Sequence, residues 1–180
     1  PHTDNPYRNP VPCIQILHCI ENAVEGGNST LVDGFTVTEE LKERYPEYYK
    51  ILTAVTVKYQ FIDKDVILEN WAEMIELDEN KNFKQVRFSP RLDFVPLIDK
   101  EKLDAYYKAR NKISEFYNSS KYRIEFKLLS GDLIMMDNYR LLHGRTSFNA
   151  NEGNRFLQGC YIDYDSTEGK IRHLKRKFNI

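Results

Sequence analysis

The stretch of sequence that decides the fold is "YRIEFKLLSGDLIMMDNYRLLHGR", residues 122–145. Its short apolar runs are broken by a Ser-Gly-Asp turn, which predicts strand, turn and strand. A further run of the same kind, "NRFLQGCYIDYD" (154–165), follows it and predicts another strand. Consecutive short strands joined by turns are typical of antiparallel sheets.

Working outward, a two-residue period covers most of the chain, and helical spacing covers less of it. Further strands are expected at 13–20, 30–35, 56–62 and in a hairpin of 72–78 with 83–88. Helices are expected at about 38–53 with a break near Pro46, at 99–119, and in a basic segment at 168–178. Strands do not alternate regularly with helices. The expected fold class is therefore mainly β with inserted helices, in an antiparallel sandwich or barrel.

Composition points to one globular domain over residues 1–180. The chain is 41% hydrophobic and 29% charged, and its 26 basic and 27 acidic side chains nearly cancel. With no overall basic field, we expect neither nucleic acid nor a membrane surface as a partner. No apolar run approaches the ~20 residues of a membrane helix, and no secretory signal opens the chain. The expected location is the cytoplasm.

The three cysteines, Cys13, Cys19 and Cys160, are an odd number. Cys13 and Cys19 lie in the apolar run "PCIQILHCI" (12–20), and the simplest interpretation is small core residues in a reducing compartment. A zinc site with His18 is the alternative. Strand alternation disfavours it, because it places both cysteines on the face opposite His18. His18 is therefore expected in the core or at a subunit contact.

Three other side chains suggest a metal site. His2 and Asp4 are two residues apart, so an extended backbone points both to the same side. His143 ends an apolar strand just before Gly144, where another backbone segment can approach closely. Two imidazoles and one carboxylate leave three positions open on an octahedral metal, an arrangement that suits non-haem Fe(II) oxygen chemistry. The pair His2 and Asp4 alone is also compatible with an ordinary polar surface.

Arg155 begins the apolar strand after His143. A cation there is costly unless it pairs with an anion, and arginine grips carboxylates through two parallel hydrogen bonds. The partner is either a bound carboxylate or an Asp or Glu on a neighbouring strand.

Two segments carry a resemblance to a known family: "PHTDNPYRNPVPCIQILHCIENAVEGGNSTLVDGF" (1–35) and "DNYRLLHGRTSFNANEGNRFLQGCYIDYD" (137–165). They resemble the Fe(II)/2-oxoglutarate-dependent dioxygenases of the taurine dioxygenase superfamily, and within it the γ-butyrobetaine hydroxylase-like branch. The resemblance implies a double-stranded β-helix, also called a jelly roll, that binds Fe(II) and 2-oxoglutarate, uses O₂ and takes ascorbate as reductant.

The resemblance also implies roles for individual residues. His2, Asp4 and His143 would be the metal ligands and so the catalytic residues. Arg155 and Thr30 would bind the distal carboxylate of 2-oxoglutarate. Asp137 and Asn138, just before the strand of His143, are expected to orient that ligand or its neighbours.

The implied substrate is a small zwitterion, in first place a quaternary-ammonium carboxylate such as γ-butyrobetaine. Tyr161 matches a family tyrosine that contacts the cation. Ser89 stands where the family carries an Asn that contacts the substrate carboxylate, and the nearby Arg91 could meet an anion instead. The same chemistry on trimethyllysine, a taurine-like sulfonate or a trimethylammonium phosphonate is the alternative. A non-catalytic jelly-roll binding module is the second alternative.

The resemblance implies two further features. The family carries more sequence before its His-x-Asp motif, whereas this chain opens on Pro1, so we expect a C-terminal fragment of a longer enzyme that lacks its first strands. A homodimer is the expected assembly.

Overall fold

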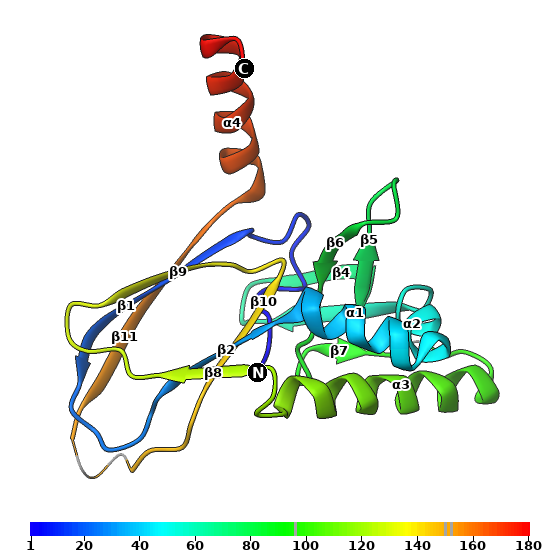
Figure 1. The fold of residues 1–180 in the computed structure, drawn as a ribbon, viewed down its shortest axis with the longest axis horizontal. Coiled ribbons are helices and arrows are strands. Elements are labelled where there is room, and N and C mark those ends of the chain that lie inside the picture. The colour runs from blue at the N-terminus through cyan, green and yellow to red at the C-terminus, as the bar shows by residue number, and fades with distance from the viewer. Residues whose placement is uncertain (96, 150, 152) are drawn as a thin grey trace.

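Two three-stranded antiparallel sheets form one half of the molecule (Figure 1). The computed structural model describes residues 1–95, 97–149, 151 and 153–180. The first sheet has the order β11-β1-β9, formed by β1 (Ile14–Asn22), β9 (Leu133–Asp137) and β11 (Arg155–Ile162). The second has the order β10-β2-β8, formed by β2 (Ser29–Asp33), β8 (Arg123–Phe126) and β10 (Leu141–Arg145). Of the two strands expected around residues 122–145, the first is confirmed as β8. A turn at 138–140 divides the second into β9 and β10, which lie in different sheets.

The segment between β2 and β8 forms the other half, which we call the helical lobe (residues 34–118; Figure 1). Its helices are α1 (Gly34–Arg44), α2 (Pro46–Leu52) and α3 (Lys100–Asn118). Its strands are β3 (Thr56–Ile62), β4 (Ile67–Glu73), β5 (Ile75–Leu77), β6 (Phe83–Val86) and β7 (Asp93–Phe94). The predicted hairpin is β5 with β6, whereas β4 was not predicted.

Helix α1 begins four residues earlier than the sequence pattern indicated. Asp33 is its N-cap, and its carboxylate accepts hydrogen bonds from the amides of Phe35 and Thr36 at 3.0 and 3.2 Å. Thr38, the first residue of the predicted helix, is buried inside α1, where its hydroxyl donates to the Gly34 carbonyl. The predicted break near Pro46 is confirmed, because Pro46 begins α2.

The largest hydrophobic core lies in the helical lobe. Helix α3 buries Tyr106, Ala109, Ile113 and Tyr117 on one face, whereas Tyr107 is 45% exposed. Val32 of β2 and Leu142 of β10 belong to the same core. The helical lobe therefore covers the outer face of the second sheet.

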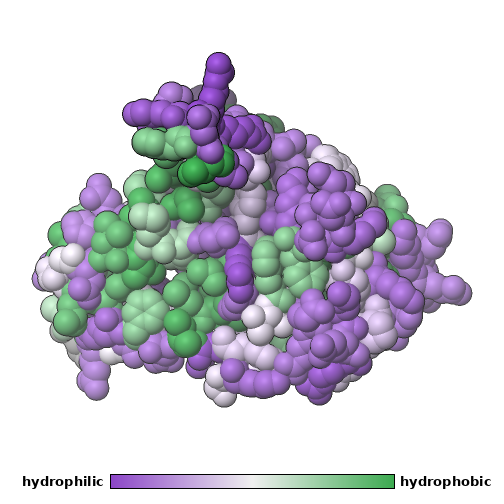
Figure 2. Space-filling view, turned by 45° about the horizontal axis from the view of Figure 1, so that its top comes forward, coloured by the Kyte–Doolittle hydropathy of each residue, from purple (hydrophilic) through white to green (hydrophobic). Residues whose placement is uncertain are grey.

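The outer face of the first sheet is uncovered. Leu133 and Met135 of β9 are 54% and 64% exposed, and Ile20 at the end of β1 is also exposed. In Figure 2, hydrophobic side chains gather over the strands, whereas the helical side is mainly hydrophilic.

The predicted C-terminal helix is confirmed as α4 (Tyr164–Phe178), which projects away from the sheets and buries none of its residues (Figure 1). Stacking of Tyr164 on Tyr139 at 5.5 Å links its first turn to the sheets. Among the described residues, no helix is both long enough and apolar enough to cross a membrane.

Candidate metal centre

The N-terminal residues lie beside β10 and bring the predicted metal ligands together. The backbones of His2 and His143 exchange two hydrogen bonds of 2.9 Å, so both imidazoles lie on the same side. Thr3 points to the opposite side, where its hydroxyl accepts from the Phe88 amide at 3.0 Å. Asp4 then returns to the side of His2. Alternation along this extended segment, with Thr3 anchored in the core, fixes the direction of both ligands.

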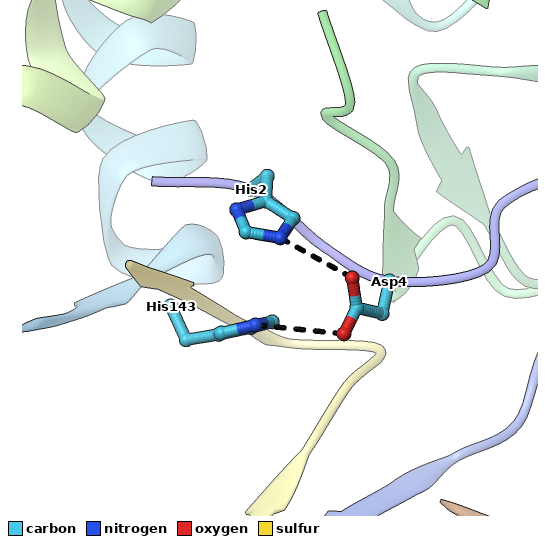
Figure 3. Close-up of side chains that lie close together, drawn as sticks. All are labelled: His2, Asp4 and His143. Carbon is cyan, nitrogen blue, oxygen red and sulfur yellow. Dashed lines mark ion pairs between the residues drawn. The ribbon is translucent and has the colours of Figure 1, made fainter. Parts of the chain in front are cut away.

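The three side chains converge as shown in Figure 3. His2 Nε2 lies 3.2 Å from Asp4 Oδ1, and His143 Nε2 lies 3.5 Å from Asp4 Oδ2. One ligand atom from each residue lies within 4.8 Å of the others, and this is the one such group found among the described residues. Two imidazoles and a carboxylate at this spacing fit a divalent transition metal that keeps open coordination positions.

The protonation states suit metal binding. Burial opposes ionisation of Asp4, but the hydrogen bond from His2, the nearby His143 and the Tyr161 hydroxyl outweigh it and lower its pKa to about 2. Burial, with repulsion from His2, lowers the pKa of His143 to about 4. At neutral pH, Asp4 is therefore a carboxylate and His143 has a free nitrogen lone pair.

Hydrogen bonds hold Asp4 by its side chain and by its backbone. Oδ2 accepts from Gln15 Nε2 at 2.6 Å and from the Tyr161 hydroxyl at 2.8 Å. Asn138 accepts from the Asp4 amide at 2.9 Å and donates to the Asp4 carbonyl at 3.0 Å. Asn138 thus orients Asp4, which lies 3.5 Å from His143 and is one of the neighbours that the sequence suggested. Asp137 instead accepts from the amide of Tyr139 in a turn.

Arg155 lies on the inner face of the first sheet without a carboxylate partner among the described residues, so the alternative of an ion pair to a neighbouring strand is not formed there. Its Nε is buried and lacks a hydrogen-bond partner in the described part of the chain. Its guanidinium lies 5.6 Å from the Phe148 ring, and that of Arg145 lies 4.5 Å from the same ring. Burial and the nearby Arg145 lower the pKa of Arg155. Two guanidinium groups thus lie around one ring, and one of them has an unused donor, an arrangement whose charge and donors are suited to an anion.

The strand register separates Thr30 from the metal ligands. His143 pairs with Leu31, so the side chains of Leu31 and Ser29 share its face of the sheet. Thr30 pairs with Gly144, and its side chain lies on the other face of the sheet. A Cβ built onto Gly144 would point to that same face and would lie 3.0 Å from Thr30 Oγ1. Alternation therefore turns the Thr30 side chain to the face opposite His143 and places the Ser29 side chain on the face of His143. The role of Thr30 toward 2-oxoglutarate stays a prediction.

Tyr161 lies between the metal ligands and a neighbouring cavity. Its hydroxyl contacts Asp4, and its side chain lines a cavity of about 540 Å³. The other lining residues are Asn5, Tyr7, Arg8, Asn9, Leu68 and Glu69. Aromatic, cationic and anionic side chains thus surround one open space beside the metal side chains.

The two other predicted substrate residues differ in their positions. Ser89 is buried and directly follows Phe88 in the sequence. The Phe88 backbone is hydrogen-bonded to that of Thr3, which lies between the proposed ligands His2 and Asp4, so Ser89 lies close to the ligand segment. Arg91 is exposed and forms no ion pair with the described residues.

The cysteines agree with the core interpretation. Cys13 and Cys19 are buried and free, and Cys160 is exposed and free. His18 lies on the outer face of β1 and is half-buried, so a zinc group with the two cysteines is not formed among the described residues. His173 is exposed on α4.

Sequence reasoning missed Gln15 and Tyr7. Alternation along β1 offered a signal for Gln15, since it shares a face with Cys13 and Cys19 and is the polar residue on that inner face. Nothing in the sequence pairs Tyr7 with Tyr161, because the two meet only when β11 lies beside β1.

Comparison with known proteins agrees with this geometry. The chain is 34% identical to the γ-butyrobetaine dioxygenase of Homo sapiens over 98% of its own length and 47% of the relative. It is 27% identical to the mitochondrial trimethyllysine dioxygenase of Bos taurus over 96% of its own length and 42% of the relative. The chain thus spans about half the length of these relatives.

A solved structure shares the fold. The crystal structure of a putative alpha-ketoglutarate dependent 2,4-D dioxygenase from Burkholderia xenovorans superposes with a TM-score of 0.71 at 17% identity, over 92% of this chain and 67% of the other. This likeness confirms the predicted jelly-roll fold. The model of the taurine catabolism dioxygenase TauD, TfdA family matches residues 1–161. The chain therefore belongs to the TauD/TfdA dioxygenase family.

Proposed function

We propose that this chain is the catalytic jelly-roll part of an Fe(II)/2-oxoglutarate-dependent dioxygenase that hydroxylates a small quaternary-ammonium carboxylate such as γ-butyrobetaine. The observation that carries the proposal is the convergence of His2, Asp4 and His143 within 4.8 Å. The family match and the names of the relatives support the reaction class. The chain spans about half the length of those relatives, so the activity of the whole protein is part of this proposal.

The proposed roles follow from the geometry. His2, Asp4 and His143 would hold Fe(II), which together with 2-oxoglutarate supplies the O₂ activation and the C–H hydroxylation. Arg155 would bind the distal carboxylate of 2-oxoglutarate with its unused Nε donor. Ser29 is better placed than Thr30 to share that carboxylate, because it lies on the face of His143.

The cavity beside Tyr161 supports a zwitterionic substrate. Tyr7 and Tyr161 can attract a quaternary ammonium group through their ring faces, and Glu69 adds negative charge. Arg8 in the same wall can face a carboxylate. Ser89 and Arg91 are proposed as further substrate contacts, Ser89 because it adjoins the ligand segment and Arg91 for its positive charge.

The test is succinate formation from 2-oxoglutarate under air with Fe(II) and ascorbate. Candidate substrates are γ-butyrobetaine, trimethyllysine, taurine and a trimethylammonium phosphonate, and the assay uses this chain and any longer protein that contains it. Stimulation by γ-butyrobetaine is expected, and none with His143→Ala. Stimulation by another compound instead would reassign the substrate. Metal binding with no turnover on any of the four would favour a binding module.

The role of Arg155 has its own test. Arg155→Ala should raise the Kd for 2-oxoglutarate at least about tenfold, since a charge-assisted contact is lost. Arg172→Ala, which removes an exposed arginine of α4, is the control and should leave the Kd unchanged. An unaltered Kd in Arg155→Ala would make Arg155 a structural residue.

Assembly and location are also proposals. The uncovered outer face of the β11-β1-β9 sheet supports a homodimer in which Leu133 and Met135 would be buried. Light scattering coupled to size-exclusion chromatography measures the mass of the particle and tests this assembly.

Three free cysteines support a reducing compartment such as the cytoplasm. The bovine relative is described as mitochondrial, so imaging of a tagged protein must decide between the two compartments.

A further inference from the structure

Gln15 is a buried polar residue that touches the metal side chains. It lies at the middle of the β11-β1-β9 sheet, paired with Tyr161 on one side and Met136 on the other. Only 2% of its surface is exposed. Because both neighbouring strands fix the backbone, the Gln15 side chain has one direction available, toward Asp4.

The carboxamide contacts two of the three proposed ligands. Nε2 donates to Asp4 Oδ2 at 2.6 Å and lies 3.4 Å from His143 Nε2. The reverse orientation of the amide would set its oxygen against the Asp4 carboxylate, so the electrostatics fix which atom faces Asp4. A buried donor to a carboxylate is a strong hydrogen bond and restrains the rotation of that carboxylate.

The opposite end of the same amide has no partner. Gln15 Oε1 is buried and has no hydrogen-bond partner among the described residues. An apolar side chain of the same length would avoid the cost of burying this oxygen. A glutamine at this position thus carries a structural cost, which indicates a role for its Nε2 at the metal side chains.

We propose that Gln15 is a positioning residue of the metal centre, which holds Asp4 Oδ2 and thereby keeps Oδ1 turned toward His2 before a metal binds. Tyr161 donates to the same oxygen, but it is partly exposed and is the weaker restraint. The inference rests on the proposed function, because it requires that the three ligands bind a metal.

The test is a calorimetric titration of the metal-free chain with Co(II), together with the visible absorption spectrum of the Co(II) form. Gln15→Met keeps the length of the side chain and removes the donor. It should weaken Co(II) binding about 10- to 100-fold, the usual loss when an outer hydrogen bond to a ligand is removed, and should change the Co(II) spectrum.

Gln85→Met is the matched control. Gln85 is also 2% exposed and has an unpartnered amide nitrogen, but it lies in β6 beside a different cavity. Its substitution should leave the affinity and the spectrum unchanged. If Gln15→Met does not fold, as judged by circular dichroism, Gln15→Asn replaces it, since it keeps the amide but is too short to reach Asp4.

The outcomes separate the two proposals. If the unsubstituted chain binds no Co(II), the metal centre fails, and this inference fails with it. If the unsubstituted chain binds Co(II) and the folded Gln15 variant binds it as tightly with the same spectrum, only the role of Gln15 is overturned.

Discussion

The two three-stranded sheets differ in what covers their outer faces. The β10-β2-β8 sheet packs Val32 and Leu142 against the helical lobe, where both are buried. The β11-β1-β9 sheet leaves Leu133 and Met135 exposed. Most of the burial that stabilises the chain therefore lies on one side of the metal centre, while Gln15, Arg155 and Tyr161 come from the less covered sheet.

The difference predicts where substitutions destabilise. Ile113→Ala in α3 should lower the free energy of unfolding by about 2–5 kcal/mol, because a fully buried side chain leaves a cavity. Met135→Ala on the outer face of β9 should change it by less than about 0.5 kcal/mol. Urea unfolding measures both. An equal loss in the two variants would mean that the outer face of the first sheet is covered in solution.

Asn138 links the ligand segment to the sheets. Asn138→Ala should cost about 2–3 kcal/mol, since the Asp4 backbone and the Pro12 carbonyl lose buried partners. Asn118→Ala at the exposed end of α3 is the control and should cost far less. Urea unfolding checks both variants, and equal losses would remove Asn138 as an anchor.

Acid should destabilise the metal-free chain through His143. Burial and repulsion from His2 lower its folded pKa to about 4, from 6.5. Between these values the unfolded chain binds more protons, so stability is highest above pH 6.5 and falls as the pH drops toward 4. From pH 7 to 5 the loss should be about 1–2 kcal/mol.

Urea unfolding in EDTA at pH 7 and pH 5 measures this loss. His143→Gln should flatten the dependence over that range, while His173→Gln on exposed α4 should preserve it. A slope unchanged in His143→Gln would assign the acid sensitivity to other groups.

The smallest effect concerns the junction between the second sheet and the helical lobe. Asp33→Ala removes the N-cap of α1 and the partner of Arg140, and should cost about 1 kcal/mol. Asp33→Asn keeps a capping oxygen and should restore most of this in thermal unfolding. Equal losses in both variants would place the effect in the Arg140 pair.

The sequence by itself determined the mainly β fold class and the three proposed metal ligands. Strands repeat every two residues, so the spacing of His2 and Asp4 was enough to put them on one side. Apolar runs located most strands, and Pro46 located the break between α1 and α2. The resemblance supplied the jelly roll and the role proposed for Arg155.

Only the tertiary structure decided the rest, because the deciding contacts join residues far apart in the chain. The register of β2 against β10 places the Ser29 side chain on the face of His143 and the Thr30 side chain on the other face. A shift of one residue would exchange the two faces. Asp33 caps α1, so the helix begins at Gly34 although glycine has a low intrinsic preference for helix. Gln15 contacts Asp4 and His143 because β1 lies across from the segment that carries the ligands. The sequence does not specify the distance between these two segments, because they meet only in the folded chain.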